Sequence, residues 1–408
     1  MRSSASRRGF LQQVGLGSLG AVAASEWLGR VAAAESPSKK LDENVLGAAG
    51  VKTSERPKAA WKPVSDRKIR VGIVGNGVCK FGPSFGFQDH PNVTVAAVSD
   101  LFPDRCAEMA KVCRCEKTYP SLEELVKDDT IEAVFVATDA PSHARLCIEV
   151  LKHGKHVASA VPACFGSIEE GHRLFEAVRA SGRKYMMFET SAFHDDCYAM
   201  RQVYRAGGFG KLIYTEGEYN HYMPNPIASY KGWRVGVPQQ WYPTHATAYY
   251  ICVTEGAFTE VSCLGSPSVI EQFQAAHNAY KNPFGTEIAL LRTVDGYMAR
   301  MAMIFDSRGP GTESGRVFGQ RGVMAGMNYS GLEKNLPNLD RPPLPPTVEP
   351  GHHGGAAGHL MNEFVTAILE DRKPMVDIAM ALNMTVPGIV AHQSALKGSE
   401  IFKVPRFI

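Results

Sequence analysis

The chain has 408 residues, of which 44% are hydrophobic and 21% are charged. One hydrophobic core rarely grows that large, so about two domains are expected. The composition excludes a disordered chain, a collagen-like fibre and a polytopic membrane protein. The net charge of +3 originates in residues 1–34, which hold four Arg and one Glu and leave 40 basic and 40 acidic side chains for the rest. A neutral body does not attract nucleic acid electrostatically, so we expect no such partner.

The nine cysteines are an odd number scattered along a long chain, which does not indicate a disulfide framework. Cys113 and Cys115 are the closest pair, and a C-x-C pair without further Cys or His ligands nearby is not a zinc site. We therefore expect reduced cysteines that are mostly buried and act as small apolar residues. We also expect no metal site.

The first 34 residues combine three features of an export signal. Arg7 and Arg8 precede an uncharged stretch of 17 residues from Gly9 to Ser25, and Ala32–Ala34 offers a small-residue cleavage site. The stretch is shorter and less apolar than a membrane span, which needs about 20 apolar residues, so stable membrane insertion is not expected. Residues 1–34 resemble a twin-arginine signal peptide, with a frayed amphipathic helix as the alternative.

A twin-arginine signal predicts a periplasmic or secreted protein that leaves the cytoplasm folded, with any nucleotide cofactor already in place. Residues 35–66 are rich in Lys, Ser, Pro and Glu without periodicity, and this composition is typical of a polar linker or wrapping arm. The folded part is therefore expected to begin near residue 67.

Residues 67–190 alternate between short apolar runs and stretches with helical spacing of apolar residues. The runs, each typical of a buried strand, are Ile69–Val74, Val93–Ser99, Ala133–Ala137, His156–Ala160 and Tyr185–Phe188. The helical stretches include Pro103–Cys115, His143–His153 and Ser167–Ser181. This alternation predicts an α/β Rossmann-type domain, in which a parallel sheet carries helices on both faces.

Residues 191–408 differ, because their apolar segments are longer and partly alternating, which indicates a mostly antiparallel sheet. The expected strands are Leu212–His221, Thr259–Leu264, Glu287–Val294 and Met298–Phe305. A proline-rich loop from Pro337 to Pro350 precedes expected helices at His359–Glu370 and Met375–Lys397. This second half is predicted to be an α+β substrate domain.

The first expected strand delivers the sequence Gly75-Asn76-Gly77 at its carboxyl end. Gly75 suits a tight turn, and Gly77 lets the backbone approach a dinucleotide pyrophosphate at the next helix N-terminus. The third glycine of the G-x-G-x-x-G pattern is replaced by Lys80, and Gly82 lies two residues further on. The pattern is therefore incomplete, and a glycine turn without a ligand is the alternative.

Asp100 supports the nucleotide interpretation because it ends the second expected strand, 25 residues beyond Gly75. A carboxylate at this place accepts hydrogen bonds from both ribose hydroxyls and repels a 2′-phosphate. NAD is therefore the expected cofactor, in preference to NADP.

Segments Ala133–Thr138, Pro141–His143 and Gly154–Val157 resemble the Gfo/Idh/MocA oxidoreductases, and the resemblance extends over residues 67–408. It implies a nicotinamide cofactor bound by a Rossmann domain. Two residues of the family's chemistry are absent, however. Val161 stands where the family keeps its catalytic lysine, and Trp241 stands where its Asp-x-x-x-His motif has the aspartate. The histidine of that motif is kept as His245.

These departures match one branch, the NAD-dependent glycosidases of glycoside hydrolase family 109. The shared motifs are Val161-Pro162-Ala163, Met186-Met187-Phe188-Glu189, Glu218-Tyr219-Asn220-His221, Trp233-Arg234, Tyr242-Pro243-Thr244-His245 and His353-Gly354-Gly355. That family usually has Glu at the position of Ala160 and Asp at the position of Ala357. Secreted Gfo/Idh/MocA paralogues share the same motifs. The resemblance therefore implies fold and cofactor more directly than it implies the reaction.

His245 and Tyr242 are the first candidate catalytic residues. An imidazole titrates near neutral pH, so His245 can take a hydroxyl proton as hydride leaves the same carbon. Tyr242 lies three residues earlier, so both side chains would point the same way on a helical turn, and its phenol could relay a proton. The alternatives are a core histidine bonded to the backbone and a buried, hydrogen-bonded tyrosine.

Three further candidate catalytic residues lie near the ends of expected elements. His221 ends an expected strand. It could bind sugar hydroxyls or act as a second acid/base, and the alternative is an exposed histidine at the strand end. Glu189 follows an apolar run at the carboxyl edge of the parallel sheet, where such sheets bind ligands, unless it caps a helix. His353 lies on a glycine-rich loop that permits close approach of a substrate. A metal site shared with His352 would need further ligands that the sequence does not place nearby.

The expected cofactor contacts are Gly75, Asn76, Gly77, Asp100, Thr138, His143 and Pro162. Of these, Thr138 and His143 are expected to line the nicotinamide ribose. Trp233 offers an apolar face for stacking on a sugar ring, and Arg234 offers a fork of donors, with a core tryptophan as the alternative.

The first hypothesis for function is an exported NAD-binding enzyme that acts on a small-molecule carbohydrate. Transient hydride abstraction would let it cleave a glycoside without net oxidation. The alternatives are a sugar or cyclitol dehydrogenase with His245 in place of the lysine, and a non-catalytic sugar-binding paralogue. Ala160 and Val161 favour the first and third hypotheses. A homo-oligomer is expected.

Overall fold

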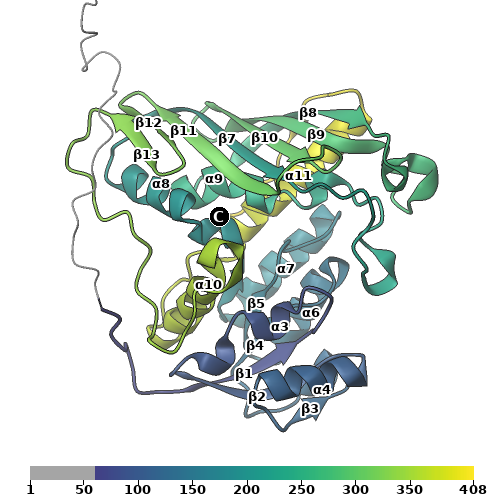
Figure 1. The fold of residues 1–408 in the computed structure, drawn as a ribbon, viewed down its shortest axis with the longest axis vertical. Coiled ribbons are helices and arrows are strands. Elements are labelled where there is room, and N and C mark those ends of the chain that lie inside the picture. The colour runs from purple at the N-terminus through teal and green to yellow at the C-terminus, as the bar shows by residue number, and fades with distance from the viewer. Residues whose placement is uncertain (1–59) are drawn as a thin grey trace, which may run out of the picture. The chain divides into compact units, whose positions relative to one another are not determined.

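The computed structural model describes residues 60–408 (Figure 1). The predicted signal peptide, residues 1–34, and residues 35–59 of the predicted linker lie outside the described residues. The described end of the linker runs without regular structure as far as residue 68 and is attached to the first domain. The Asn92 side-chain amide donates to the Ser65 and Arg67 carbonyls at 2.7 and 2.8 Å.

The first half of the chain forms a six-stranded parallel sheet with the order β3-β2-β1-β4-β5-β6, as expected for a Rossmann fold. Its strands are β1 (Ile69–Val74), β2 (Val93–Ser99), β3 (Thr118–Tyr119), β4 (Ala133–Val136), β5 (His156–Ser159) and β6 (Tyr185–Met187). Strands β4 and β6 are buried throughout, which is why continuous apolar runs marked them in the sequence. The predicted parallel sheet is confirmed.

The connections of this sheet contain helices of very different length. They are α3 (Phe81–Ser84), α4 (Pro103–Val112), α5 (Leu122–Leu125), α6 (His143–Lys152) and α7 (Ile168–Ser181). Helix α7 has regular ends, because the Ser167 hydroxyl accepts from the Glu170 N–H and Gly182 stops the helix in a left-handed conformation. Helix α3, which follows the glycine loop, is a single turn.

The second half forms an eight-stranded sheet with the order β13-β12-β11-β7-β10-β9-β8-β14. Its strands are β7 (Leu212–Asn220), β8 (Phe258–Pro267), β9 (Phe284–Thr293), β10 (Met298–Ile304), β11 (Thr312–Gly319), β12 (Gly322–Ala325), β13 (Asn328–Gly331) and β14 (Phe402–Lys403). All neighbours pair antiparallel except β7 and β10, which are parallel. The predicted, mostly antiparallel sheet is confirmed.

Four longer helices belong to this half: α8 (Asp195–Arg205), α9 (Thr244–Thr254), α10 (His352–Leu369) and α11 (Ile378–Leu396). Helices α9 and α11 pack on the face of the second sheet that is turned toward the Rossmann domain (Figure 1). Helix α11 is almost completely buried, since it also contacts α7 and β6 of the Rossmann domain. Both halves therefore share one apolar helix.

Two sequence expectations about the chain as a whole can be compared with the structure. The nine cysteines, all within the described residues, are unpaired, and seven of them are buried. Cys79 is the exposed one. Within residues 60–408, no helix is both long enough and apolar enough to cross a membrane.

Candidate functional site

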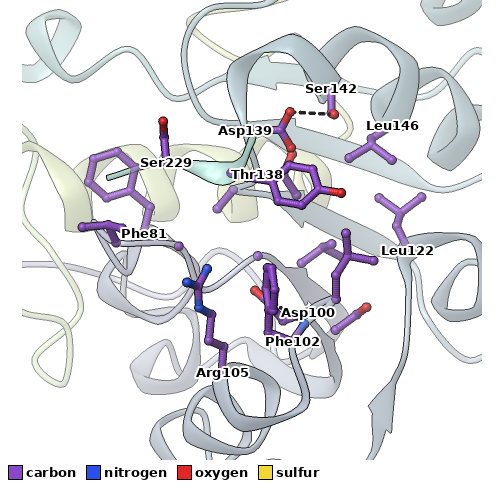
Figure 2. A pocket seen from close by; sticks show the side chains of 18 of the residues that line it. Phe81, Asp100, Phe102, Arg105, Leu122, Thr138, Asp139, Ser142, Leu146 and Ser229 are labelled. Atoms are coloured by element: carbon purple, nitrogen blue, oxygen red, sulfur yellow. Dashed lines mark hydrogen bonds between the residues drawn. The ribbon is translucent and has the colours of Figure 1, made fainter. Parts of the chain in front are cut away.

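A cavity of about 490 Å³ lies at the carboxyl ends of β1, β2 and β4 (Figure 2). One wall is the loop after β1 together with Asp100, Phe102 and Thr138, and the opposite wall is residues 228–234. A parallel α/β sheet binds nucleotides at this edge, where the strand order reverses between β1 and β4. The cavity is therefore the expected place of the dinucleotide.

The glycines of the loop after β1 have separate roles. Gly75 has a φ of +101°, and a Cβ on it would meet the Ala137 carbonyl oxygen at 2.4 Å. A Cβ on Gly82 would meet the Gly75 carbonyl oxygen at 2.3 Å, so Gly82 provides the close packing usually given by the third glycine. A Cβ on Gly77 would project into open space, with nothing within 4 Å. The loop thus leaves room for a ligand at Gly77.

Asp100 lies in the cavity wall with its carboxylate fixed by the backbone. One oxygen accepts from the Asn76 N–H at 2.7 Å and the other from the Phe102 N–H at 2.9 Å. Each carboxylate oxygen retains a lone pair for a ribose hydroxyl. Asn76 is itself buried and does not line the cavity, so its part is to orient Asp100.

The polar groups of the cavity wall fit a dinucleotide. The Ser99 and Thr138 hydroxyls line the cavity and are buried, yet neither has a hydrogen-bond partner within residues 60–408. Buried hydroxyls normally find a partner, so these two are open for groups of a ligand. Together with Asp100 and the space at Gly77, they match what a ribose and a diphosphate require.

His143 and Pro162 were expected to contact the cofactor, but neither lines the cavity. His143 is fully buried, with Nδ1 2.9 Å from the Pro162 carbonyl oxygen and Nε2 3.3 Å from the Thr138 carbonyl oxygen. The expectation that His143 lines the nicotinamide ribose is therefore wrong. Burial lowers the pKa of His143, which keeps it neutral as a link between these two backbone segments.

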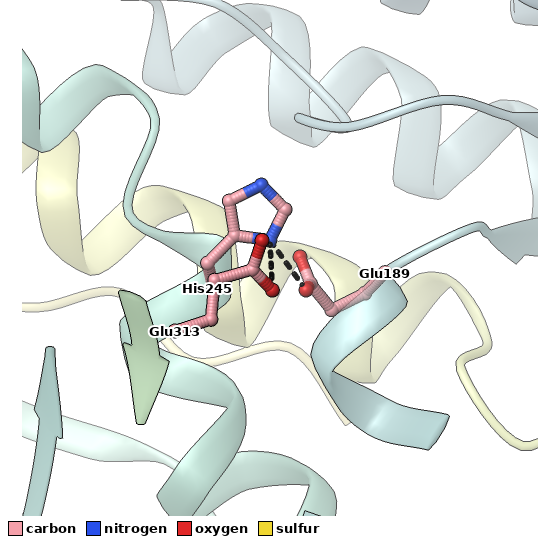
Figure 3. A group of neighbouring side chains, drawn as sticks. All are labelled: Glu189, His245 and Glu313. Carbon is pink, nitrogen blue, oxygen red and sulfur yellow. Dashed lines mark hydrogen bonds and ion pairs between the residues drawn. The ribbon is translucent and has the colours of Figure 1, made fainter. Parts of the chain in front are cut away.

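Three ionisable side chains from both domains form one group, in which Glu189 and His245 are buried and Glu313 is partly buried (Figure 3). Glu189 follows β6, His245 lies in the first turn of α9, and Glu313 lies on β11. His245 Nδ1 donates to Glu189 Oε1 at 2.8 Å and lies 3.6 Å from Glu313 Oε2. Figure 3 shows Nε2 on the opposite side of the ring from both carboxylates. The arrangement orients the imidazole and leaves Nε2 for a substrate.

Glu189 combines the two interpretations that the sequence left open. Its Oε1 accepts from the Ser191 N–H at 2.9 Å, so it caps the short 3-10 helix Thr190–Phe193, and the same oxygen accepts from His245. Glu189 is fully buried, and burial favours its neutral form, but the charge and hydrogen bond of His245 outweigh this and lower its pKa. The carboxylate is thus held ionised next to the imidazole.

His245 differs from the histidine expected from the sequence in its protonation state. Burial alone would lower its pKa, but the charges of Glu189 and Glu313 outweigh burial and raise it to about 9. At neutral pH His245 is therefore an imidazolium and can donate a proton from Nε2. The expectation of a near-neutral base at this position is corrected, because the second carboxylate was not foreseen.

Tyr242, Tyr219 and His221 extend the group toward the substrate side. The rings of Tyr242 and Tyr219 lie 5.7 and 4.7 Å from the His245 ring. Tyr242 precedes α9 rather than lying on it, yet both side chains meet as expected. His221 directly follows β7, 5.7 Å from the Tyr219 ring, and its Nδ1 is buried without a hydrogen-bond partner in the described chain. Burial and the charges of Arg234 and His245 lower the pKa of His221.

His353 lies near the same group, at the start of α10. His353, Gly354 and Gly355 all have positive φ values, so the expected glycine-rich loop forms an irregular first turn of the helix. The His353 ring lies 5.5 Å from the Phe81 ring of the cavity wall. Burial, followed by the charge of His352, lowers its pKa to about 4, so His353 is neutral.

Arg234 and Trp233 connect the cavity with the acid/base group. Both residues line the cavity. The Arg234 guanidinium lies 4.2 Å from the Trp233 ring centre and 6.0 Å from that of Tyr242. Trp241, at the place of the family's aspartate, instead packs against Gly166 and Phe165 in the core. Tyr242 and His245 do not line the cavity, but the Arg234 side chain in its wall lies next to Tyr242, which in turn contacts His245.

Within the described residues, Glu189, His245 and Glu313 are the group whose atoms could hold a metal ion. The 2.8 Å contact between His245 Nδ1 and Glu189 is that of a hydrogen-bonded ion pair, which occupies the nitrogen a metal would need. Within the described residues, the hydrogen-bond partners of His352 are His353 and the Ser84 hydroxyl, and neither is a carboxylate or a cysteine. The absence of a metal site therefore stays a prediction.

The sequence did not identify Glu313, His194 or Tyr219 as members of this group. Glu313 Oε2 accepts from the Ser191 hydroxyl at 2.7 Å and lies 3.5 Å from His194 Nε2. Tyr219 stands in a motif that the sequence did single out. For Glu313 there was no local signal, because it lies on a strand of polar and small residues far from Glu189 in the chain.

The comparisons with known proteins agree with this geometry. The Gfo/Idh/MocA profile, described as an oxidoreductase family with an NAD-binding Rossmann fold, matches residues 69–189. A glycosyl hydrolase family 109 protein of Solibacter usitatus (strain Ellin6076) is 25% identical, over 83% of this chain and 88% of that protein. Residues 69–189 thus match the Gfo/Idh/MocA oxidoreductase family, and the chain as a whole resembles the family 109 proteins.

Other family 109 proteins match this chain at similar sequence identity. One from Shewanella sp. (strain ANA-3) is 24% identical, over 78% of this chain and 73% of its own length. One from Bacteroides fragilis (strain YCH46) is 28% identical, but the match covers 42% of this chain and 39% of that protein.

Solved structures with this fold include two dehydrogenases. Levoglucosan dehydrogenase in complex with NADH and levoglucosan has a TM-score of 0.66 and 18% identity, over 83% of this chain and 100% of its own. Myo-inositol 2-dehydrogenase from Lactobacillus plantarum has a TM-score of 0.64 and 16% identity, with the same coverage. These identities establish the fold. The family match over residues 69–189, together with the fit of the cavity, identifies the chain as an NAD-dependent oxidoreductase.

Proposed function

We propose that this enzyme is exported and uses NAD to cleave a glycoside through a cycle without net oxidation. One observation carries the proposal: two histidines on either side of Tyr219 have pKa values moved in opposite directions. His221 is kept neutral and can accept a proton, while His245 is kept protonated and can donate one. Such a divergence of neighbouring groups is what a site needs for acid and base roles at one pH.

Bound NAD would supply a hydride acceptor that turns a sugar hydroxyl carbon into a ketone and can later return the hydride. A ketone acidifies the adjacent C–H bond, and neutral His221 is placed to take that proton. The His245 Nε2–H would protonate the leaving oxygen as the glycosidic bond breaks. The neutral His245 left behind would take a proton from the water that adds to the sugar. The hydroxyl proton lost with the hydride would pass to solvent and be recovered when the hydride returns, and His221 would give its proton back to the carbon as water adds, so that the cycle consumes only water.

A carbohydrate substrate is supported by the names of the relatives and by the wall of the site. The relatives are called glycosyl hydrolases, and one structural neighbour contains levoglucosan. In this chain, Trp233 and Tyr242 stack at 6.4 Å, and Tyr242 contacts His245, so an aromatic cluster links the cavity wall with the acid/base group. Aromatic side chains with a polar group such as the Tyr242 hydroxyl suit a sugar ring with its hydroxyls. The homo-oligomer expected from the sequence stays a prediction.

A panel of aryl glycosides tests this function, with released aglycone and NADH absorbance followed in the same cuvette. The proposal expects aglycone release without net NADH. Net NADH formation without aglycone would replace it with the dehydrogenase alternative. If protein shown to contain NAD releases no aglycone and forms no NADH, a sugar-binding paralogue would be favoured.

Export through the twin-arginine route is proposed from Arg7, Arg8 and Ala32–Ala34 alone. A protein that needs a nucleotide from the cytoplasm has reason to cross the membrane already folded around it. Replacing both arginines by lysine is expected to trap the precursor in the cytoplasm, measured by fractionation and immunoblotting. Unchanged export of that variant would contradict the proposal, whatever the glycoside panel shows.

A further inference from the structure

Residues 228–234 form a wall of the nucleotide cavity although they belong to the second domain. Ala228, Ser229, Tyr230, Lys231, Trp233 and Arg234 all line the cavity, opposite the glycine loop and Asp100 (Figure 2). The segment lies between β7 and α9, so it crosses to the Rossmann domain and back. We call residues 228–234 the strap.

The strap touches the Rossmann domain where the adenosine half of a dinucleotide would lie. The Tyr230 ring meets the Phe102 ring edge-on, with centroids 6.2 Å apart. Phe102 follows Asp100 by two residues, and its backbone N–H holds the Asp100 carboxylate. The two aromatic rings therefore close the cavity beside the ribose position.

The polypeptide around the strap is fastened at three places. The Gln272 side-chain amide donates to the Met223 carbonyl at 2.7 Å and accepts from the Gly236 N–H at 3.2 Å. Trp233 is buried, and its carbonyl accepts from the Tyr280 hydroxyl at 2.6 Å. Residues 224–226 are exposed, as is Lys231, which is held at a φ of +51°. The part of the strap before Trp233 can therefore adjust to a ligand without disturbing the second sheet.

The charge of the strap matches a diphosphate. Among the described residues, Lys231 and Arg234 have no carboxylate ion-pair partner, although each stands beside an aromatic ring. A dinucleotide diphosphate carries two negative charges. Helix α3, which would normally help to bind it, has only four residues and therefore a weak dipole. Of the other cations that line the cavity, Lys80 and Arg145 are paired with Glu108 and Glu123, and Arg105 lies over the Phe102 ring, so the strap supplies positive charge in addition to Arg105.

We propose that the strap is a part of the NAD site that holds the diphosphate through Lys231 and Arg234 and closes over the adenosine half through the Tyr230–Phe102 contact. The strap retains the cofactor from one turnover to the next. This inference rests on the assignment of NAD as cofactor and not on the proposed glycoside cleavage. It explains how an exported enzyme keeps a nucleotide where none is supplied.

The dissociation rate of NADH from the purified holoprotein tests the inference. Fluorescence is followed after mixing with excess NAD⁺, in the wild type and in Tyr230→Ala. Loss of one aromatic contact is expected to speed dissociation about 2- to 10-fold. Tyr230→Phe keeps the ring and is the matched control, with a rate close to wild type. Equal rates in the wild type and Tyr230→Ala would overturn the proposal, as would Tyr230→Phe as fast as Tyr230→Ala.

The charge of the strap is tested with Lys231→Gln. Its control is Lys281→Gln, another surface lysine with a positive φ that does not line the cavity. Faster NADH dissociation is expected for Lys231→Gln and not for Lys281→Gln, with a smaller dependence of the rate on salt than in the wild type. The same rate and salt dependence in all three proteins would contradict the role of Lys231.

Cys79 gives a second measurement that does not depend on activity. It lines the cavity and is the exposed cysteine among the nine. Bound NAD under a closed strap is expected to slow its alkylation by iodoacetamide, and Tyr230→Ala is expected to restore fast alkylation. Identical alkylation in both holoproteins would overturn the proposal. A protein that retains NAD normally but leaves all glycosides intact would contradict the proposed function alone.

Discussion

His245 Nδ1 lies 2.8 Å from Glu189 Oε1, and this contact joins the first turn of α9 to the end of the last Rossmann strand. Glu189 is fully buried and His245 is 5% exposed, so the ion pair is formed away from water. The contact fixes the imidazole relative to the carboxyl edge of the parallel sheet, where the cofactor binds.

His245→Ala is therefore expected to lower turnover about 10²- to 10⁴-fold, the usual loss for a positioned acid/base group. NAD affinity should change little, because His245 does not line the nucleotide cavity, where the expected cofactor contacts Gly75, Gly77 and Asp100 lie. Stopped-flow turnover and fluorescence titration of NAD measure the two effects. Near wild-type turnover would exclude His245 and direct attention to His221 or His353. Lost NAD binding would show a structural role instead.

Glu313→Gln should leave His245 in place but remove one of the two charges that raise its pKa. An opposite charge at this distance typically moves a pKa by about one to three units. The alkaline limb of the rate against pH is expected to shift to lower pH by that amount. Glu218→Gln, which removes a carboxylate paired with Arg300 on the second sheet, is the matched control. If the alkaline limb of the rate profile does not move, Glu313 does not raise the pKa of His245.

The raised pKa of His245 also predicts how stability depends on pH. The folded value of about 9 exceeds the ordinary value of 6.5, so the folded state binds the proton more tightly than the unfolded state. The corresponding stabilisation is fully present below about pH 6.5 and is lost as pH rises toward about 9. Urea unfolding should show this loss in the wild type and a smaller one in His245→Gln. The same loss of stability with rising pH in both proteins would contradict this prediction.

Gly77 and Gly82 allow a prediction that separates folding from cofactor binding. A Cβ at Gly77 meets nothing within 4 Å, whereas a Cβ at Gly82 meets the Gly75 carbonyl oxygen at 2.3 Å. Gly77→Ala should therefore keep the melting temperature of the apoprotein and lose NAD affinity. Gly82→Ala should lose both. Normal NAD binding by folded Gly77→Ala would show that the diphosphate does not approach this residue.

Asp100→Ala is expected to narrow the preference for NAD over NADP. The Asp100 carboxylate repels the 2′-phosphate of NADP and cannot make the hydrogen bonds that it makes to the ribose hydroxyls of NAD. The combined penalty for binding NADP is about 2–4 kcal/mol. Asp104→Ala, which removes a carboxylate from the first turn of α4, is the control and should keep the wild-type preference. Titrations that give wild-type protein the same affinity for both cofactors would refute the assignment.

The Rossmann half was predictable because its strands are buried on both faces and appear as continuous apolar runs. The second half of the fold was less predictable from the sequence. Strands β12 and β13 are short, β11 to β13 all contain glycine, and α9 is rich in Thr and Tyr, which have low helix propensity. Burial of α9 between the second sheet and α11 decides its conformation. Such tertiary effects leave little trace in a single sequence.

The candidate site shows the same limit. His245, Tyr242, His221 and Glu189 could be proposed from their places at the ends of elements, and the structure brings them together. Glu313 could not, since its position depends on the pairing of β11 with β7. Because Glu313 raises the pKa of His245, the protonation state expected from the sequence was wrong even though the residue was placed correctly.

The contacts of Glu313 connect the buried ion pair to the solvent. Glu313 Oε2 lies 3.6 Å from His245 Nδ1 and 3.5 Å from His194 Nε2, and the His194 side chain is 17% exposed. Glu313 and His194 thus lie between the imidazolium and bulk water, on the side of the ring opposite Nε2. His245 is therefore linked electrostatically to a partly exposed side chain, although its own ion pair with Glu189 is shielded from water.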